Sequence, residues 1–149
     1  MSERPIAEPR DAYPFFTRIP TRWMDNDLYG HINNAVYYSF FDTAVNSYLI
    51  DRGALDVHAE DGVIGLVVET HCNFFSPLQY PDTIEVGVRV ARVGTSSVRY
   101  EIGLFADAAA ASAASGHFVH MYVERATRQP VALPKELLTA LAPLRTDRS

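Results

Sequence analysis

The segment NAVYYSFFDTAVNSYLIDR, residues 34–52, contains neither glycine nor proline, and Gly53 follows it directly. This length and this stop are typical of a helix that ends at a glycine. Apolar side chains occupy most positions and leave only a narrow polar strip of Ser39, Asp42, Thr43 and Asn46. Such a wide apolar sector predicts a helix that the rest of its domain encloses. At about 1.5 Å per residue, this helix is long enough to run the length of a small domain.

Strand-like segments lie on both sides of the predicted helix. Alternating or continuous apolar residues mark them at 15–23, 63–75, 82–94, 96–107 and 115–125. Pro20 favours an edge position for the first segment, because proline lacks the amide that a central strand donates. The alanine tract 108–114 has helical propensity, but its place between two long strands leads us to predict a hairpin connection. Residues 134–144 are expected to form a short helix with Pro134 in its first turn.

The order of these elements predicts an α+β domain. One face of the segments 82–94 and 96–107 is apolar throughout: Ile84, Val86, Val88, Val90, Val98, Tyr100, Ile102 and Leu104. Only a curved antiparallel sheet is long enough to cover the apolar sector of the helix. We expect one domain over residues 15–142, a flexible N-terminal arm over 1–14 and a C-terminal tail over 143–149. Because a chain this short can hardly cover the helix and both faces of the sheet, we expect a homodimer or homotetramer.

The composition is that of a globular protein. The 149 residues are 48% hydrophobic and 21% charged, with a formal net charge of -5. An acidic chain lacks the basic patches typical of nucleic-acid binding or of contact with an anionic membrane surface, and no apolar run approaches the roughly 18 residues of a membrane span. Cys72 has no second cysteine for a disulfide, which favours a reducing compartment. We therefore expect a cytoplasmic protein without nucleic-acid or membrane partners.

The loop MDNDLYGHINN, residues 24–34, concentrates hydrogen-bonding and titratable groups just ahead of the predicted helix. A structural interpretation accounts for several of them. Asn33 is a favoured N-cap, and Gly30 suits a positive φ angle in a turn. Asp25 and Asp27 precede the helix start, where the helix dipole favours negative charge. On this interpretation, Asp25 and Asn33 hold the loop in shape.

The same loop also has the groups that acyl transfer needs. A helix N-terminus presents free backbone amides, which can hold a carbonyl oxygen as negative charge develops on it. A carboxylate just upstream, such as Asp27, can attack the carbonyl carbon or deprotonate a water molecule. His31 can orient or polarise one of these partners. The combination predicts acyl transfer or hydrolysis without a serine or cysteine nucleophile.

The wider segment RWMDNDLYGHINNAVYYSFFDTAVNSYL, residues 22–49, resembles the hotdog-fold acyl-CoA thioesterases of the 4-hydroxybenzoyl-CoA thioesterase type. Their signature runs roughly as aromatic-x-D-x-D-x-x-G-H-[VI]-N-N-x-x-Y. The resemblance covers roughly residues 15–142 and is specific at 22–38. It implies a hotdog fold, which is a curved antiparallel sheet wrapped around one long central helix. It also implies hydrolysis of an acyl-CoA thioester to a free acid and coenzyme A.

The resemblance implies a role for several loop positions. Asp27 matches the catalytic carboxylate, which acts as nucleophile or general base, and the backbone amide of Asn34 matches the group that polarises the thioester carbonyl. Asp27 and His31 also match residues of the related plant acyl-carrier-protein thioesterases, where an asparagine stands in place of Tyr29. The expected catalytic set is therefore Asp27, His31 and Asn34, and the expected substrate-binding residues nearby are Tyr29, Gly30, Asn33 and Tyr37.

Further along the helix, Asp42 stands where many relatives carry a glutamate. Its shorter side chain reaches less far, so we interpret Asp42 as a member of the polar strip. The acyl pocket is expected between the long helix and the sheet of a partner subunit. Its candidate lining residues are aromatic, although the same residues also suit a plain core: Tyr37, Tyr38, Phe40, Phe41 and Phe74.

The segment RVGTSS, residues 92–97, completes the expected substrate-binding set. In the family that the chain resembles, this turn lies near the nucleotide end of coenzyme A. It contains a glycine that would free backbone amides, hydroxyls that suit phosphate and a positive charge: Arg92, Gly94, Thr95, Ser96 and Ser97. An ordinary hairpin turn explains the same residues equally well, so both interpretations stay open.

We predict that the chain hydrolyses an acyl-CoA thioester, with coenzyme A as part of the substrate and no metal or other cofactor. His117 and His120 should point to opposite faces of a strand, which argues against a shared metal site. One alternative is a hotdog module that binds acyl-CoA without turning it over. Another is a hotdog enoyl-CoA hydratase or dehydratase, but these enzymes typically carry D-x-N-P-x-H, whereas Asp27 and His31 are four positions apart with no proline between them.

Overall fold

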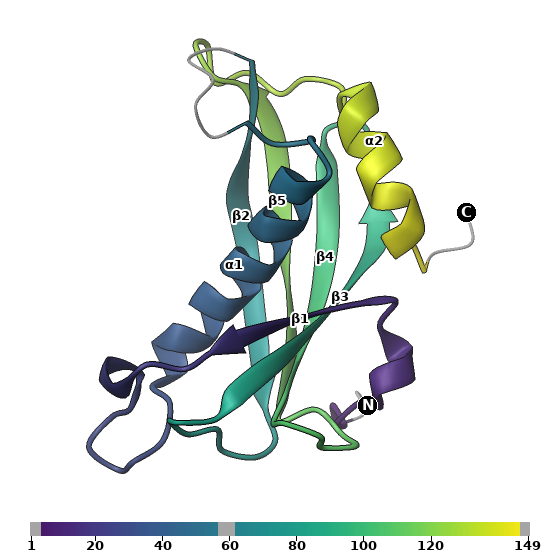
Figure 1. The fold of residues 1–149 in the computed structure, drawn as a ribbon. Coiled ribbons are helices and arrows are strands. Elements are labelled where there is room, and N and C mark those ends of the chain that lie inside the picture. The colour runs from purple at the N-terminus through teal and green to yellow at the C-terminus, as the bar shows by residue number, and fades with distance from the viewer. Residues whose placement is uncertain (1–3, 57–61, 147–149) are drawn as a thin grey trace.

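Five antiparallel strands curve around one long helix, and a short helix lies at the end of the sheet opposite the start of the long one (Figure 1). The computed structural model describes residues 4–56 and 62–146. Every predicted strand and helix is present within three residues of its expected bounds. In chain order the elements are β1 (Phe15–Pro20), α1 (Asn34–Asp51), β2 (Val63–Phe74), β3 (Thr83–Val93), β4 (Ser97–Phe105), β5 (Ala114–Glu124) and α2 (Lys135–Leu141), with 3-10 turns at Arg10–Ala12, Trp23–Asp25 and Ala142–Leu144.

The sheet has the strand order β1-β3-β4-β5-β2, and all neighbouring strands are antiparallel. β1 forms one edge, as Pro20 predicted, and β2 forms the other. The alanine tract 108–114 connects β4 to β5 and starts β5, with no helix, which confirms the predicted hairpin connection. The predicted α+β hotdog architecture is therefore confirmed.

The core lies between α1 and the concave face of the sheet. The alternating residues of β3 and β4 that we expected to face inward are all fully buried. α1 covers them with seven buried side chains: Tyr37, Phe40, Phe41, Ala44, Val45, Tyr48 and Leu49. Each large apolar side chain contributes about 1.5–3 kcal/mol when it leaves water, which is why this face holds the helix in place. No helix in the described part of the chain is both long and apolar enough to cross a bilayer.

Both ends of α1 have the caps that the sequence predicted. At the start, the side chain of Asn33 accepts a hydrogen bond from the amide of Ala35 at 2.9 Å. At the end, Gly53 adopts a φ of +73°, and its amide donates to the carbonyl of Ile50. The amide of Ala54 then donates to the carbonyl of Leu49, so the last turn is closed by the chain that leaves it.

Residues 4–14 lie against the outer face of the sheet, where we expected a flexible arm. The ring of Tyr13 packs over two glycines, because a Cβ at Gly87 or Gly103 would come within 2.7 Å of it. The guanidinium of Arg89 binds both oxygens of the Glu8 carboxylate, at 2.6 and 3.0 Å. The arm therefore docks because β3 and β4 provide a slot for the ring of Tyr13, and because Arg89 provides a cation for the carboxylate of Glu8. Residues 1–3 of the expected arm lie outside the described residues.

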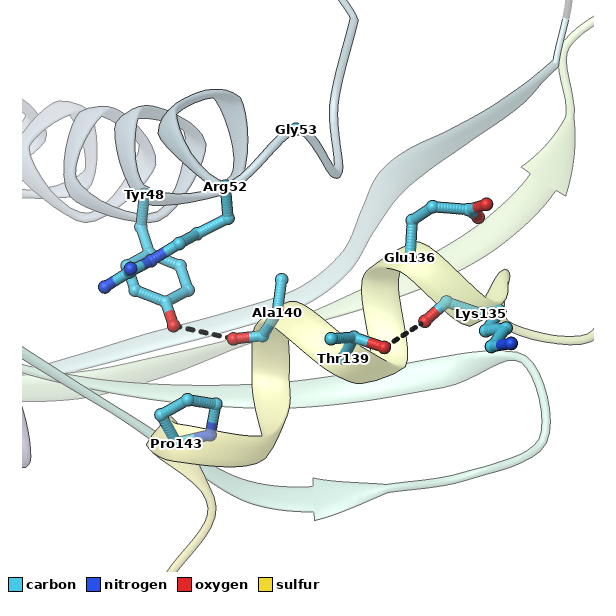
Figure 2. Close-up of a pocket in the computed structure, with 8 residues that line it drawn as sticks. All are labelled: Tyr48, Arg52, Gly53, Lys135, Glu136, Thr139, Ala140 and Pro143. Carbon is cyan, nitrogen blue, oxygen red and sulfur yellow. Dashed lines mark hydrogen bonds between the residues drawn. The ribbon is translucent and has the colours of Figure 1, made fainter.

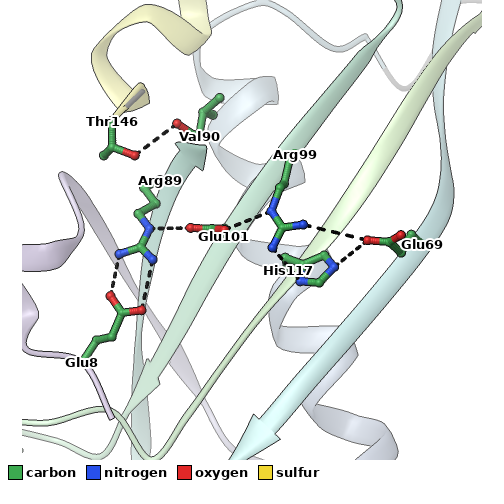
Figure 3. Close-up of polar contacts among 8 residues, drawn as sticks. All are labelled: Glu8, Glu69, Arg89, Val90, Arg99, Glu101, His117 and Thr146. Atoms are coloured by element: carbon green, nitrogen blue, oxygen red, sulfur yellow. Dashed lines mark hydrogen bonds and ion pairs between the residues drawn. The ribbon is translucent and has the colours of Figure 1, made fainter. Parts of the chain in front are cut away.

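The Glu8–Arg89 pair is one end of a chain of ion pairs that crosses the outer face of the sheet (Figure 3). Arg89 also binds Glu101 at 2.8 Å, and Glu101 binds Arg99 at 3.0 Å. Arg99 in turn donates to Nδ1 of His117. Nε2 of His117 lies 2.7 Å from the carboxylate of Glu69 on β2. Alternating charges on neighbouring strands thus connect the arm to the β2 edge.

The expected C-terminal tail, residues 143–149, is also partly packed. Leu144 is buried, and the amide of Thr146 donates to the carbonyl of Val90. Residues 144 and 146 thus pack against the end of β3, next to α2. Residues 147–149 lie outside the described residues.

Candidate active site

The loop between β1 and α1 is held by its own backbone. The amide of Asp27 donates to the carbonyl of His31 at 2.8 Å, and the amide of Gly30 donates to the carbonyl of Asp27. Gly30 has a φ of +80°, as the sequence predicted, a conformation that other residues rarely adopt. The amide of Ile32 donates to the carbonyl of Leu78, which ties the loop to the segment after β2. The loop is therefore a fixed platform at the start of α1.

Asp25 and Asn33 hold this platform, as the structural interpretation expected. The carboxylate of Asp25 is buried and accepts hydrogen bonds from the amide of Arg22 at 2.7 Å and from its guanidinium at 2.9 Å. The carbonyl of Asp25 accepts from the amide of Asn33 at 2.9 Å. Charge-assisted hydrogen bonds of this kind are the stronger ones in proteins, so Asp25 fixes the position from which α1 starts.

Asp27 is half-buried, and its two carboxylate oxygens differ. Oδ1 accepts hydrogen bonds from the amides of Tyr29 at 2.8 Å and His31 at 3.4 Å. Oδ2 has no hydrogen-bond partner within the part of the chain that the structure describes. The carboxylate is thus oriented by one oxygen while the other is available for chemistry.

The first amide of α1 is also available. The amide of Ala35 is taken by the side chain of Asn33, and the amide of Val36 donates to the carbonyl of Asn33. No acceptor for the amide of Asn34 is found among residues 4–56 and 62–146. A free amide at a helix N-terminus, where the helix dipole is positive, is suited to hold a developing oxyanion.

Asp27 and Asn34 line one hollow of about 290 Å³ together with His31 and Tyr37. The imidazole of His31 is exposed and has no hydrogen-bond partner among the described residues. The ring of Tyr37 is buried against Phe74, with 4.9 Å between ring centres, and burial raises the pKa of its hydroxyl. The hollow therefore combines a carboxylate, a free helix amide and an apolar wall.

Residues 21–141 match the sequence profile of the thioesterase-like superfamily. The chain belongs to this superfamily. The PA5185 protein from Pseudomonas aeruginosa strain PAO1 is 51% identical, with a TM-score of 0.92 over 97% of this chain and 100% of that one. A thioesterase from Thermus thermophilus, solved as a complex with coenzyme A and Zn, is 28% identical, with a TM-score of 0.72 over 89% and 95%. The Bacillus subtilis protein YsmA is 21% identical over 64% of this chain and 64% of its own length.

The remaining expected residues of this thioesterase-like chain lie in two places. Tyr29 is 84% exposed at the loop tip and contributes its backbone amide to Asp27 rather than its ring to the hollow. The turn at residues 92–97 lies at the other end of β3, about 30 Å along the strand from the end that adjoins the loop. Within one subunit, the turn and Asp27 are therefore not brought together.

The expected phosphate site stays a prediction, and its backbone amides differ from one another. Gly94 does not free its backbone amide, which donates to the carbonyl of Ser97 at 2.8 Å. The carbonyls of Thr95 and Ser96 accept hydrogen bonds from the amides of Leu133 and Tyr122. The turn is thus tied to neighbouring segments through its carbonyls, and no acceptor for the amides of Thr95 and Ser96 is found among the described residues.

Residues 75–77 also line the hollow, although the sequence did not predict it. The amides of Phe75 and Ser76 both donate to the carbonyl of Ala113, which bends the chain sharply after β2. The only signal in the sequence was that the family resemblance over residues 15–142 includes this segment, with no indication of which neighbours it meets. Ile32, the other missed residue, is buried beneath the loop.

A second hollow of about 370 Å³ lies beside α1, between the helix and β2. Among the predicted lining aromatics, Tyr38 and Phe41 line this hollow, Tyr37 and Phe74 line the first one, and Phe40 lines neither. Asp42 also lines the second hollow and accepts a hydrogen bond from Asn46 within the polar strip. The expected aromatic pocket is thus divided between two adjacent hollows along α1.

His117 and His120 point to opposite faces of β5, as their spacing predicted. His117 binds Glu69 on the outer face, beside the ring of His71. His120 is buried in the core, where Nδ1 lies 3.4 Å from the hydroxyl of Tyr122. Glu69 and His71 are exposed near the β2 edge.

Proposed function

We propose that the chain hydrolyses an acyl-CoA thioester to a free acid and coenzyme A. One observation carries the proposal: the free oxygen of Asp27 and the free amide of Asn34 belong to the same hollow at the start of α1. The Thermus thermophilus thioesterase with bound coenzyme A supports the choice of carrier, as does membership of the thioesterase-like superfamily. The only cysteine does not compete for the role of nucleophile, because burial raises the pKa of Cys72 to about 11.

In the proposed reaction, the thioester carbonyl oxygen accepts a hydrogen bond from the amide of Asn34. Asp27 either attacks the carbonyl carbon or removes a proton from the water molecule that attacks it. As the new C–O bond forms, negative charge collects on the carbonyl oxygen, next to the helix N-terminus. The C–S bond then breaks, and the coenzyme A thiolate takes up a proton. Where Asp27 is the nucleophile, this step leaves a mixed anhydride on Asp27, which water hydrolyses to release the free acid and restore the carboxylate. His31, exposed at the rim, is placed to orient the water or the thioester.

The acyl group is proposed to lie against the apolar wall of Tyr37 and Phe74 and to extend along α1 into the second hollow. Tyr38 and Phe41 make that hollow aromatic, which favours an aromatic or compact apolar acyl group. The proposed nucleotide contacts come from the turn residues Arg92, Gly94, Thr95, Ser96 and Ser97. Since these residues lie far from Asp27 within one subunit, a second subunit would have to supply them.

A homodimer, or a homotetramer built from dimers, is proposed for this reason and for another. β2 is an edge strand of 12 residues with apolar side chains left exposed: Leu66 by 38%, Val67 by 52% and Val68 by 58%. A long apolar edge of this kind is typical of a strand that pairs with another chain. The cytoplasm is the proposed location, because an unpaired Cys72 suits a reducing compartment.

The test is the release of free thiol from a panel of acyl-CoA esters, short, long and aromatic, by the wild-type chain and by Asp27→Asn. We expect thiol release by the wild type, its loss in Asp27→Asn, and near-normal release by the matched control Asp51→Asn, which changes an exposed carboxylate at the far end of α1. Hydration of an enoyl-CoA without thiol release would assign the hydratase alternative. Thermal stabilisation by acyl-CoA without any thiol release would assign the binding module.

A further inference from the structure

A third hollow, of about 550 Å³, lies between the last turns of α1 and the short helix α2 (Figure 2). It is lined by Tyr48, Arg52, Lys135, Thr139, Ala140 and Pro143 among others. Tyr48 follows Asn34 by 14 residues on α1, so this hollow lies about 20 Å from the candidate active site. The reaction proposed above does not use it.

Arg52 lies at one end of this hollow with its guanidinium stacked on a ring. Its guanidinium lies over the ring of Tyr48, 4.8 Å from the ring centre. The hydroxyl of Tyr48 donates to the carbonyl of Ala140 at 2.6 Å, which fixes the ring and therefore the platform beneath the guanidinium. The structure gives Arg52 no carboxylate partner among the described residues. Stacking uses the face of a guanidinium and leaves its N–H donors at the edge free.

The helix end and the ring account for the position of the guanidinium but not for its free edge. A cation near the last carbonyls of a helix is favoured by the helix dipole, and stacking on a ring four residues earlier is an ordinary helix pair, but neither contact uses the N–H donors at the edge. Figure 2 shows Arg52 at one end of the hollow and Lys135 with Glu136 at the other. Between these ends, the surface is formed by the Tyr48 ring, Ala140 and Pro143. The free N–H edge of the Arg52 guanidinium thus adjoins a mainly apolar surface.

We propose that this hollow binds an amphipathic carboxylate, with its acid group on Arg52 and its apolar body over Tyr48, Ala140 and Pro143. A guanidinium edge matches the two oxygens of a carboxylate in geometry and charge. The lining has two cations against one carboxylate, Glu136, so it suits a single negative charge rather than a phosphate of higher charge. The site is separate from Asp27 and does not depend on the proposed reaction.

The probe is octanoate, added to the full chain carrying Asp27→Asn so that turnover plays no part. Binding is followed through the backbone amide signals of α2 in NMR spectra, which separates this hollow from the candidate active site. We expect saturable shifts of the α2 signals and about tenfold weaker binding by Arg52→Gln, because one charge-assisted pair is lost. The matched control, Arg128→Gln, removes the charge of an exposed arginine elsewhere and should bind as before.

Two further measurements distinguish the carboxylate from its alternatives. Octanol, which has the apolar body without the charge, and inorganic phosphate, which has charge without the body, should shift the α2 signals far less than octanoate. Thr139→Phe places a ring in the hollow from an exposed helix position and should abolish binding without unfolding the chain. Equal binding by Arg52→Gln and the unmodified chain, or equal effects of octanol and octanoate, would overturn the proposal.

Discussion

The backbone amide of Tyr29 donates a 2.8 Å hydrogen bond to Oδ1 of Asp27. The same oxygen accepts from the amide of His31 at 3.4 Å, so one half of this carboxylate closes the loop. A structural role and the proposed chemical role therefore coincide in one side chain. Substitutions at Asp27 can separate the two, because an amide oxygen accepts hydrogen bonds as a carboxylate oxygen does, whereas a methyl group does not.

Asp27→Asn should keep the loop and lose the chemistry, while Asp27→Ala should lose both. We expect thiol release to fall by roughly 10²–10⁴-fold in each variant, since neither can act as base or nucleophile. In urea unfolding, Asp27→Ala should be less stable than Asp27→Asn by about 1 kcal/mol, the net value of a typical hydrogen bond. Wild-type turnover by Asp27→Asn would remove Asp27 from the reaction.

Asn34→Pro removes the free backbone amide of residue 34 and leaves the side chains of Asp27 and His31 in place. Asn34 is the first residue of α1, where proline is well tolerated, and Asn33 already has a backbone conformation suited to precede proline, with φ -61° and ψ 138°. Deleting one oxyanion donor should lower kcat by roughly 10²–10³-fold. Asn34→Ala keeps the amide and should retain most activity. Equal activity of the two variants would place the oxyanion elsewhere.

The sequence predicted most accurately those features that depend on neighbours in the chain. The helix caps at Asn33 and Gly53 and the turn at Gly30 each follow from a few consecutive residues, and all three are confirmed. The alternation of β3 and β4 identified their buried faces for the same reason. Asp27 and Asn34 meet in one hollow because the loop that joins them is only a few residues long.

Features that depend on distant segments could not be predicted. The docking of Tyr13 requires Gly87 and Gly103 to be adjacent on two strands, which follows only from the register of β3 and β4. The wall formed by residues 75–77 depends on hydrogen bonds from Phe75 and Ser76 to Ala113, which lies far along the chain at the start of another strand. The prolines and charges of residues 1–14 suggested a flexible arm. The glycines that form the slot for Tyr13 lie far along the chain, so the composition of the arm gave no sign of them.

Val68→Lys tests the proposed role of the β2 edge in assembly. Val68 is 58% exposed in the strand, at the position where the pairing with β5 shifts register. A lysine there should oppose strand pairing between subunits, because charged edge residues disfavour it. We expect analytical ultracentrifugation to show a smaller species than the wild type. The control Leu138→Lys changes an apolar residue of α2 that is 43% exposed and should leave the mass unchanged. An unchanged mass in Val68→Lys would exclude this edge.

His120 makes the stability of the fold depend on pH. Its ring is buried among aromatic side chains, with ring centres 4.6 Å from Phe118 and 5.2 Å from Tyr100. Burial lowers the pKa of His120 from its ordinary 6.5 to about 4. Between these two values, the unfolded chain binds a proton at this position and the folded chain does not. The free energy of unfolding should therefore fall as the pH falls from 6.5 to about 4.

His120→Leu should remove this component of the pH dependence. A shift of this size corresponds to roughly 3 kcal/mol, so the wild type should lose about that much more stability than the variant between about pH 7.5 and pH 4. Urea unfolding curves at several pH values measure the difference directly. Parallel profiles for the wild type and His120→Leu would mean that His120 is protonated equally in the folded and unfolded chains.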